Sequence, residues 1–342
     1  MVLLQGIYTQ QQMLYDVSDP VHPRLLCIFT NTSAHLVTGA TVEWLKPISD
    51  SETDIVLHAL GANDTRVGTF PFRVTSGAWL PDGSVMAYTL QVPADNTNYV
   101  GGGVAVYLYA HQQTGPLYTY SNGIGDCICR FGLPPEVLAI SPDGQYVVSG
   151  RIAGKGSDPL AVYRVSDRAR FVTLDNKVMG AVWDRSGHRL FLNSFDTTSA
   201  QSWTPEAGYA TLAGAAPWRY LPGLSPDGGE VAYTDYSDPN VMAQPRAYVY
   251  DLKAGTTRML INQIRTQVLF VKDGWVWYLE DRACTPADSC AGSTMPTGKV
   301  FAMQLSAGTE TEVTFAAGEN PVAHAGGVNW LPFGPGEFWP AT

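Results

Sequence analysis

The feature that most constrains the fold is an eleven-residue pattern that recurs along the chain. Each copy starts with a large apolar residue, has glycine four positions later, and continues as a run rich in alternating apolar residues. Five copies align without a gap: Trp79–Thr89, Ile140–Gly150, Trp183–Asn193, Leu224–Thr234 and Phe270–Glu280. Recurrence of one unit along a chain indicates a repeat architecture.

The residues around each glycine are those of a tight turn between two strands. Proline presets φ, aspartate bonds back to the backbone and glycine accepts positive φ. The apolar residues on both sides therefore belong to paired strands. Leading residues of consecutive copies are 41 to 61 positions apart. That spacing is too long for a hexapeptide solenoid and suits a four-stranded blade.

Two degenerate copies bring the number of leading residues to seven. Trp44 leads a copy without the glycine, and Trp330 leads one that has Gly334. The leading residues are then Trp44, Trp79, Ile140, Trp183, Leu224, Phe270 and Trp330. We predict an all-β, seven-bladed β-propeller of four-stranded antiparallel blades, with residues 1–342 as one domain. Residues 1–30 read as outer strands that complete the last blade and close the ring.

Two copies carry the turn Ser-Pro-Asp-Gly intact, at Ser141–Gly144 and Ser225–Gly228, and Leu80–Gly83 is a near match. In these residues the chain resembles the TolB-type, WD40-like (PD40 repeat) propeller family. The resemblance covers almost the whole chain and implies the architecture. It implies little about activity, because such repeats serve transport accessory proteins, peptidase propellers and lyases alike.

Composition excludes some classes of partner. The chain has a formal net charge of −10 with 21 Lys and Arg and no basic run, so we expect no nucleic-acid partner. Without an apolar stretch near 18 residues, we expect no membrane span. The N-terminus lacks the charged and apolar regions of a signal peptide. We expect a monomer.

Five cysteines constrain the redox environment. Cys284 and Cys290 flank a short polar segment and are candidates for a small disulfide, which would fit a periplasmic or extracellular protein. Cys127 and Cys129 would point to the same side of an extended strand. They are open to three readings: ligands of a soft metal, a disulfide from one of them to Cys27, or two small buried hydrophobes. We predict no metal site and no cofactor.

The long loops between the second and third strands of a blade, and the joints between blades, share one face of a propeller, where ligands usually bind. We place the candidate ligand-binding residues there. Asp126 and Arg130 flank the cysteine pair, and His35 and His324 each precede a leading Trp in blades expected to be neighbours. Aromatic and cationic residues of the joints complete the set: Trp218, Arg219 and Arg265. Trp218 has a second reading, packing between blades.

No linear catalytic motif is present, and the catalytic residues are unknown. The chain lacks a Gly-x-Ser-x-Gly elbow, a His-Glu-x-x-His motif and a phosphate-binding loop. We therefore expect a binding or scaffold propeller whose long-loop face takes a protein, peptide or carbohydrate partner at the channel mouth. The alternative is a hydrolase or lyase with its active site at that mouth. A third reading is the propeller part of a larger peptidase.

Overall fold

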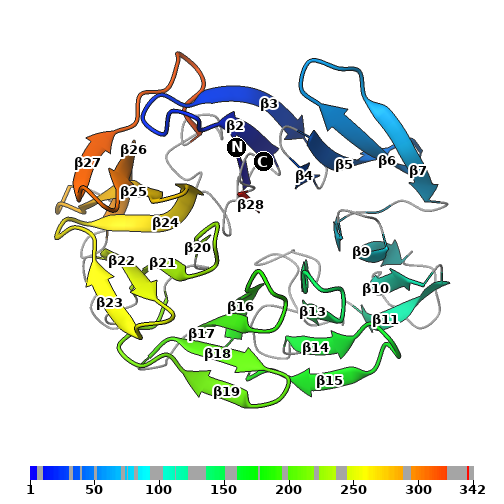
Figure 1. Ribbon diagram of the computed structural model, residues 1–342. Coiled ribbons are helices and arrows are strands. Elements are labelled where there is room, and N and C mark those ends of the chain that lie inside the picture. The colour runs from blue at the N-terminus through cyan, green and yellow to red at the C-terminus, as the bar shows by residue number, and fades with distance from the viewer. Residues whose placement is uncertain are drawn as a thin grey trace. The chain divides into compact units, whose positions relative to one another are not determined.

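The computed structural model describes residues 1–5, 11–30, 34–38, 41–49, 52–70, 74, 76–80, 84–92, 103–111, 113–121, 136–150, 160–175, 178–194, 199–218, 223–235, 245–287, 294–321 and 337–338. The regular elements of this part are strands that form seven four-stranded antiparallel sheets (Figure 1). Seven such blades make a seven-bladed β-propeller, and the fold class expected from the repeats is confirmed.

The first sheet is β28 (Glu337–Phe338), β1 (Val2–Gln5), β2 (Gln11–Asp16) and β3 (Arg24–Thr30), and the next is β4 (Ala34–Thr38), β5 (Thr41–Pro47), β6 (Thr53–Ala59) and β7 (Thr65–Phe70). Then follow β8 (Ser76–Trp79), β9 (Val85–Val92), β10 (Gly103–Ala110) and β11 (Gln113–Ser121), and β12 (Glu136–Ile140), β13 (Tyr146–Gly150), β14 (Ala161–Arg164) and β15 (Arg170–Thr173). The last three are β16 (Val178–Trp183), β17 (Leu190–Ser194), β18 (Gln201–Thr204) and β19 (Gly208–Thr211); β20 (Gly223–Leu224), β21 (Glu230–Thr234), β22 (Ala247–Asp251) and β23 (Thr256–Met259); and β24 (Arg265–Lys272), β25 (Trp275–Ala283), β26 (Thr294–Gln304) and β27 (Thr309–Glu312).

Contacts divide the chain into two compact units. Unit 1 comprises Met1–Val42, Ala59–Gly61 and Phe191–Thr342, and unit 2 comprises Glu43–His58 and Ala62–Leu190. The single domain expected from the sequence stays a prediction. In the part of the chain that the structure describes, no helix is long and apolar enough to cross a membrane.

The Ser-Pro-Asp-Gly turns form as their chemistry predicts. The hydroxyl of Ser141 donates to Oδ1 of Asp143 at 2.6 Å and accepts from the backbone N–H of Tyr146 at 2.9 Å. The N–H of Gly144 donates to the carbonyl oxygen of Ser141 at 2.8 Å, with φ at +72°. That φ favours glycine, which is why the residue recurs at the fourth position. The turn at Ser225 repeats the same bonds.

The leading residues mark first strands in most blades but not in all. Trp79, Ile140, Trp183 and Leu224 are the last residues of β8, β12, β16 and β20. Trp44 was misplaced: it lies inside β5, the second strand of its sheet, because β4 precedes it. The copy lacks the glycine turn, so the tryptophan alone could not identify the strand. The copy led by Trp330 lies outside the described residues.

The N-terminal strands share a sheet with a strand from the C-terminal end of the chain. β1 pairs with β28 through Val2↔Phe338 and Leu3↔Glu337. The order β28–β1–β2–β3 puts the C-terminal strand first, with the N-terminal strands following it in the sheet. That residues 1–30 complete the last blade stays a prediction. Closure of a ring through this sheet stays a prediction.

Within unit 1, this N-terminal sheet packs on the sheet of β24 to β27. Their shared core contains Leu4, Met13 and Tyr15 from one sheet and Leu269 and Trp277 from the other. The rings of Tyr15 and Trp277 meet edge to face, with centroids 6.4 Å apart. Both sheets thereby bury apolar faces that water would otherwise contact.

Candidate functional site

At one end of the sheet of β24 to β27, the long loop between β25 and β26 lies beside the joint that precedes β24. Arg265, at the start of β24, pairs with Glu280 near the end of β25. Asp281 of β25 in turn pairs with Pro296 near the start of β26. The joint before β24 and the loop between β25 and β26 therefore leave the sheet at the same end, called here the long-loop end.

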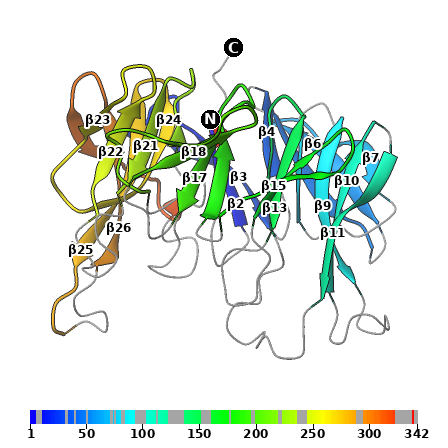
Figure 2. The same cartoon turned by 90° about the horizontal axis from the view of Figure 1, so that it is seen from below.

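At this end β25 and β26 continue beyond their neighbours as a two-stranded ribbon (Figure 2). The pairing of β24 with β25 ends at Arg265↔Glu280, and β27 pairs only with Phe301–Gln304 of β26. Asp281–Ala283 and Thr294–Pro296 thus pair with each other alone, and we call them the ribbon. The residue that follows the ribbon, Cys284, is disulfide-bonded.

Arg265 occupies the base of the ribbon as a buried cation paired with two carboxylates. Its side chain is 6% exposed, and its guanidinium pairs with Glu310 and lies 3.5 Å from Oε1 of Glu280. Nη1 donates to the carbonyl oxygen of Ile264 at 3.0 Å, and the guanidinium lies 4.5 Å from the ring centroid of Phe301. Arg265 was expected as a ligand on an exposed rim. The structure instead buries Arg265 against two carboxylates. Its charge is therefore paired within the sheet and does not face a partner.

The neighbouring carboxylates tie the ribbon to the sheet. The hydroxyls of Thr266 and Thr294 each donate to a different oxygen of Asp281 at 3.1 Å. The hydroxyl of Thr297 donates to Oε2 of Glu280 at 2.8 Å. These bonds join β24, β25 and β26 where the four-stranded sheet gives way to the ribbon. They hold the base of the ribbon in one arrangement.

A phenol near this network stays neutral over the ordinary pH range. Burial, followed by the charge of Glu310, raises the pKa of Tyr278. Its ring lies 5.6 Å from the guanidinium of Arg265. Tyr278 therefore stays protonated and does not serve as a base at neutral pH.

Trp218 lies just before β20, in the sheet of β20 to β23, and packs among aromatic side chains. Its side chain is buried, with ring centroids 5.8 Å from Phe191 and 6.1 Å from Tyr233. Its backbone forms an isolated bridge with Asp235, whose carboxylate accepts from the N–H of Arg246 at 2.8 Å. Of the two readings of Trp218, packing is the one that the structure supports. A buried indole does not present a face to a partner.

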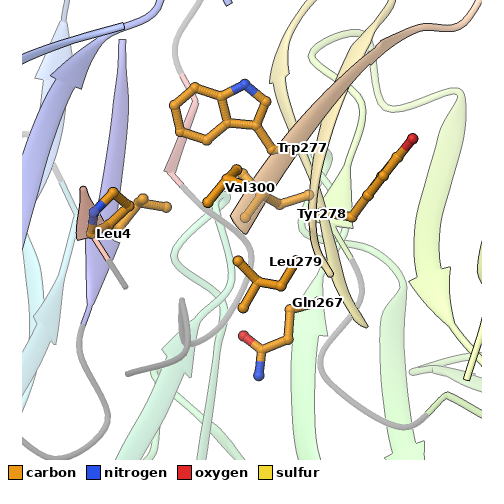
Figure 3. Close-up of a pocket in the computed structure, with 8 residues that line it drawn as sticks. Leu4, Gln267, Trp277, Tyr278, Leu279 and Val300 are labelled. Atoms are coloured by element: carbon orange, nitrogen blue, oxygen red, sulfur yellow. The ribbon is translucent and has the colours of Figure 1, made fainter. Parts of the chain in front are cut away.

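A small pocket opens between β1 and the sheet of β24 to β27 in unit 1 (Figure 3). It is lined by Leu4, Gln267, Leu269, Trp277, Tyr278, Leu279, Val300 and Pro321. The space that they enclose holds about one water molecule. Gln267 is the one lining residue with a carboxamide, and every other side chain contributes carbon surface apart from the polar tips of Trp277 and Tyr278.

Gln267 has an unusual backbone. Its φ is +56°, and the pairing of β24 with β25 shifts register between Thr266 and Leu269. This β-bulge turns the carboxamide inward, where the residue is 6% exposed and Oε1 has no hydrogen-bond partner. A bulge of this kind re-aims a side chain at a cost in strain.

The remaining expected site residues lie largely outside the described residues. Asp126, Arg130, Arg219 and His324 fall there, as do Cys127, Cys129 and Cys290. For His35 the structure gives only the backbone, in β4. The ligand roles of these residues stay predictions, and so does the pairing of Cys284 with Cys290.

Cys27 is a thiol, which removes its disulfide to Cys127 or Cys129 from the alternatives. Its Sγ lies 3.9 Å from the carbonyl oxygen of Ile28, to which it donates. Among the described residues, no three His, Cys, Asp or Glu side chains gather in a group that could hold a metal.

No local sequence pattern points to Gln267 or to the partners of Arg265. Gln267 follows Arg265 and Thr266 in an ordinary strand pattern, and one extra residue in a strand leaves no trace in alternation this short. Glu310 is 45 positions from Arg265, so only the fold brings them together.

No protein-family model matches the chain, and no curated protein matches it. Solved structures do resemble it. TolB from Acinetobacter baumannii is 14% identical, with 91% of this chain and 78% of that chain covered and a TM-score of 0.42. A putative TolB from Agrobacterium tumefaciens is 16% identical, covering 76% and 89%, with a TM-score of 0.42.

Two further similar structures are not TolB proteins. The β-propeller domain of Cps50 (Swd1) from Myceliophteria thermophila is 11% identical, covering 82% of this chain and 90% of that chain, with a TM-score of 0.46. Kuenenia stuttgartiensis hydrazine synthase is 12% identical, with 69% of this chain covered and a TM-score of 0.43, and the match spans 64% of that chain. These likenesses concern the fold alone. The fold assignment rests on the seven four-stranded sheets and on the Ser-Pro-Asp-Gly turns, in which the chain resembles the TolB-type, WD40-like β-propellers.

Proposed function

We propose that the protein is a binding or scaffold propeller that takes a protein partner on its long-loop face. The observation that carries the proposal is the ribbon of β25 and β26. It extends past both neighbouring strands and is followed by a disulfide-bonded cysteine, Cys284. Peptide and carbohydrate partners belong to the same proposal as weaker options, because a backbone ribbon offers strand edges more than sugar-stacking faces.

The ribbon has the properties of a rigid recognition element. A two-stranded hairpin is marginally stable alone in water, so an extension of this kind needs support. Asp281 and the hydroxyls of Thr266 and Thr294 support its base, and the disulfide at Cys284 constrains its far end. Rigidity before binding reduces the entropy that binding has to overcome.

The ribbon residues Arg282 and Ala283 continue into Cys284–Ala287, and we call residues 282–287 the arm. Its exposed residues are accessible to a partner. Arg282, Ala283, Thr285, Pro286 and Ala287 are all exposed. By contrast, the polar groups at its base are engaged with one another, as Arg265 and Asp281 show. This division between a bonded base and an exposed arm favours binding over chemistry at this end of the sheet.

The disulfide also supports a location outside the cytoplasm. Disulfides persist in the periplasm and in secreted proteins, whereas cytosolic thiols are kept reduced. A periplasmic or extracellular site of action therefore forms part of the proposal. The proposal includes no nucleic-acid partner, because the formal net charge of the chain is −10. It also includes a monomer, as expected from the sequence.

Site-specific crosslinking tests the proposal. A photo-crosslinking amino acid is placed at Thr285, on the exposed arm, and in a control chain at Lys253, in the exposed β22–β23 turn. We expect one protein to crosslink from Thr285 and not from Lys253. That protein is then identified, purified and titrated, and the substitution Arg282→Glu is expected to weaken its binding at least about tenfold while Lys253→Glu leaves it unchanged.

Equal crosslinking from both positions, or equal affinity of both charge variants, would contradict the proposal that a protein partner binds the ribbon. A panel of hydrolase and lyase substrates is run on the same preparation. Turnover that survives Arg282→Glu would favour the alternative reading of the chain as an enzyme.

A further inference from the structure

We propose that the hairpin of β14 and β15 is a second docking surface, which takes an acidic segment of a partner protein that carries an aromatic residue. The surface consists of the ring of Phe171 and the exposed side chains of Arg164 and Arg170. This inference goes beyond the proposed function, because the hairpin belongs to unit 2 and the ribbon belongs to unit 1.

The first argument is an aromatic ring held at the surface. Phe171 is 40% exposed and lies in β15, the outer strand of its sheet. The pairing of β14 with β15 shifts register between Val162↔Val172 and Tyr163↔Arg170. Phe171 is therefore the extra residue of a β-bulge, a feature that re-aims a side chain at the edge of a sheet. The strand leaves regular pairing at the residue whose ring it exposes.

The second argument is the support beneath this ring. Trp183 is 5% exposed, Tyr146 is partly buried, and Phe171 continues the row outward. The ring centroid of Tyr146 lies 6.0 Å from that of Trp183 and 5.8 Å from that of Phe171. An exposed ring that buried neighbours hold in place loses little freedom when a partner binds it.

The third argument is charge. Residues 161–173 contain three arginines and one aspartate, in a chain whose formal net charge is −10. Arg168 is used between sheets, since its Nη2 donates to the carbonyl oxygen of Gln113 at 3.3 Å. Arg164 and Arg170 are exposed. This locally positive surface attracts an acidic segment, which the net charge of the rest of the chain repels.

Arg164 joins the charge to the ring. Its Cζ lies 5.6 Å from the ring centroid of Phe171, and its Nη2 lies 2.7 Å from Oδ2 of Asp167. A guanidinium has five N–H donors, so an ion pair through one nitrogen leaves donors for a second carboxylate. A partner carboxylate bound there would lie beside the ring of Phe171. The partner's own aromatic side chain would then pack on that ring.

Other polymers use only part of this surface. A phosphate backbone would gain from the arginines, but it would meet Asp167 and gain little from the ring of Phe171. A neutral oligosaccharide would contact the ring without using the charges. An acidic peptide with an aromatic residue uses both features.

Matched peptides test the surface with the full chain. Fluorescein-labelled Gly-Glu-Asp-Phe-Asp-Glu-Gly is compared by fluorescence anisotropy with Gly-Gln-Asn-Phe-Asn-Gln-Gly, which lacks the charges, and with Gly-Glu-Asp-Ala-Asp-Glu-Gly, which lacks the ring. We expect the first peptide to bind about fivefold more tightly than either, the value of a pair of exposed ion pairs or of one ring contact. Added salt should shrink the charge preference and leave the ring preference.

Two variants locate the effect, each with a matched control. Arg164→Glu should remove the preference for the acidic peptide, whereas Lys253→Glu, at an exposed cation of the β22–β23 turn, should leave it. Phe171→Thr should remove the preference for the peptide with a ring. Met259→Thr removes a side chain that is 46% exposed on another outer strand, β23, and should change nothing. All four side chains are exposed, so we expect each variant to fold, which circular dichroism checks.

Three results would overturn the proposal: equal binding of the three peptides, preferences that survive both Arg164→Glu and Phe171→Thr, or no peptide binding at millimolar concentration. A single-stranded oligothymidylate is titrated in parallel. Tighter binding of this polyanion than of the acidic peptide, lost in Arg164→Glu, would assign the surface to another class of partner and equally overturn the proposal. Because no substitution touches the ribbon, failure here leaves the partner-binding proposal standing, and the reverse also holds.

Discussion

At the scale of single residues, Arg265 shows how a charge can be structural. Its partner Glu310 is only 14% exposed, so removing the cation leaves a carboxylate with little water around it. We predict that Arg265→Met lowers the free energy of unfolding by about 3–5 kcal/mol. Urea unfolding followed by tryptophan fluorescence measures the change.

Two controls separate burial from charge. Lys299 and Glu312 form a pair on the same sheet whose side chains are about half exposed, and Lys299→Met is expected to leave stability unchanged within error. The double substitution Arg265→Met with Glu310→Leu should recover part of the loss, since the more buried of the two carboxylates is then removed, while Glu280 is 26% exposed and keeps the hydroxyl of Thr297. Equal losses from Arg265→Met and Lys299→Met would contradict this account.

Gly223 lets β20 lie close to β24, because it has no Cβ. A Cβ there would lie 2.9 Å from Cα of Leu269 and 3.4 Å from the carbonyl oxygen of Val268. Both are backbone atoms of β24, which cannot yield without moving the strand. Gly223→Ala is predicted to cost about 1–3 kcal/mol in the free energy of unfolding. At Gly68 a Cβ would meet only Cδ1 of Ile55, at 3.6 Å, so Gly68→Ala is the matched control and should cost clearly less.

At the scale of elements, β21 and β22 place two carboxylates opposite each other. Glu230 pairs with Asp251 across the strands. Burial raises the pKa of Glu230; Arg258 opposes this rise, while Asp227, Asp251 and Asp273 add to it. The folded state therefore holds the proton of Glu230 more tightly than the unfolded state does. As pH rises through the ordinary glutamate range and the raised pKa, the wild-type protein loses stability.

Glu230→Gln removes this titration. We predict that the variant is more stable than the wild type at pH 7, and that the difference shrinks as the pH falls below the ordinary glutamate pKa. Chemical unfolding at a series of pH values measures it. A variant that is less stable at pH 7, or a difference independent of pH, would show that the charge of Glu230 is not costly in the fold.

The ribbon of β25 and β26 depends on its disulfide for order. Ala283 pairs with Thr294 immediately before Cys284. We predict that Cys284→Ser, or reduction of the wild-type protein, speeds amide hydrogen exchange at Ala283 and Thr294. Exchange at Val276 and Met303, in the four-stranded part, should not change. Reduction should add nothing in Cys284→Ser, and an effect of reductant there would point to another bond.

At the scale of the whole molecule, the parts that the sequence could predict are those that depend on local chemistry. The turns at Ser141 and Ser225 form because their bonds lie within six residues, and these turns carry the repeat and the fold class. Trp44 could not be placed without such a turn. The site depends on long-range contacts and on one extra residue in β24, so Glu310 and Gln267 gave no local sign.

The pairing of β28 with β1 is where the ends of the chain meet in one sheet. Two residue pairs join them, Val2↔Phe338 and Leu3↔Glu337. A chain that ends at residue 336 leaves β1 as an open edge, whereas one that ends at residue 338 keeps the pairing. We predict that the shorter chain loses about 1–3 kcal/mol of unfolding free energy relative to the longer, the value of a few backbone hydrogen bonds. It should also self-associate through the bared edge, which size-exclusion chromatography detects. Equal stability and size of the two chains would mean that β28 does not hold the first sheet together, and would count against a ring closed through it.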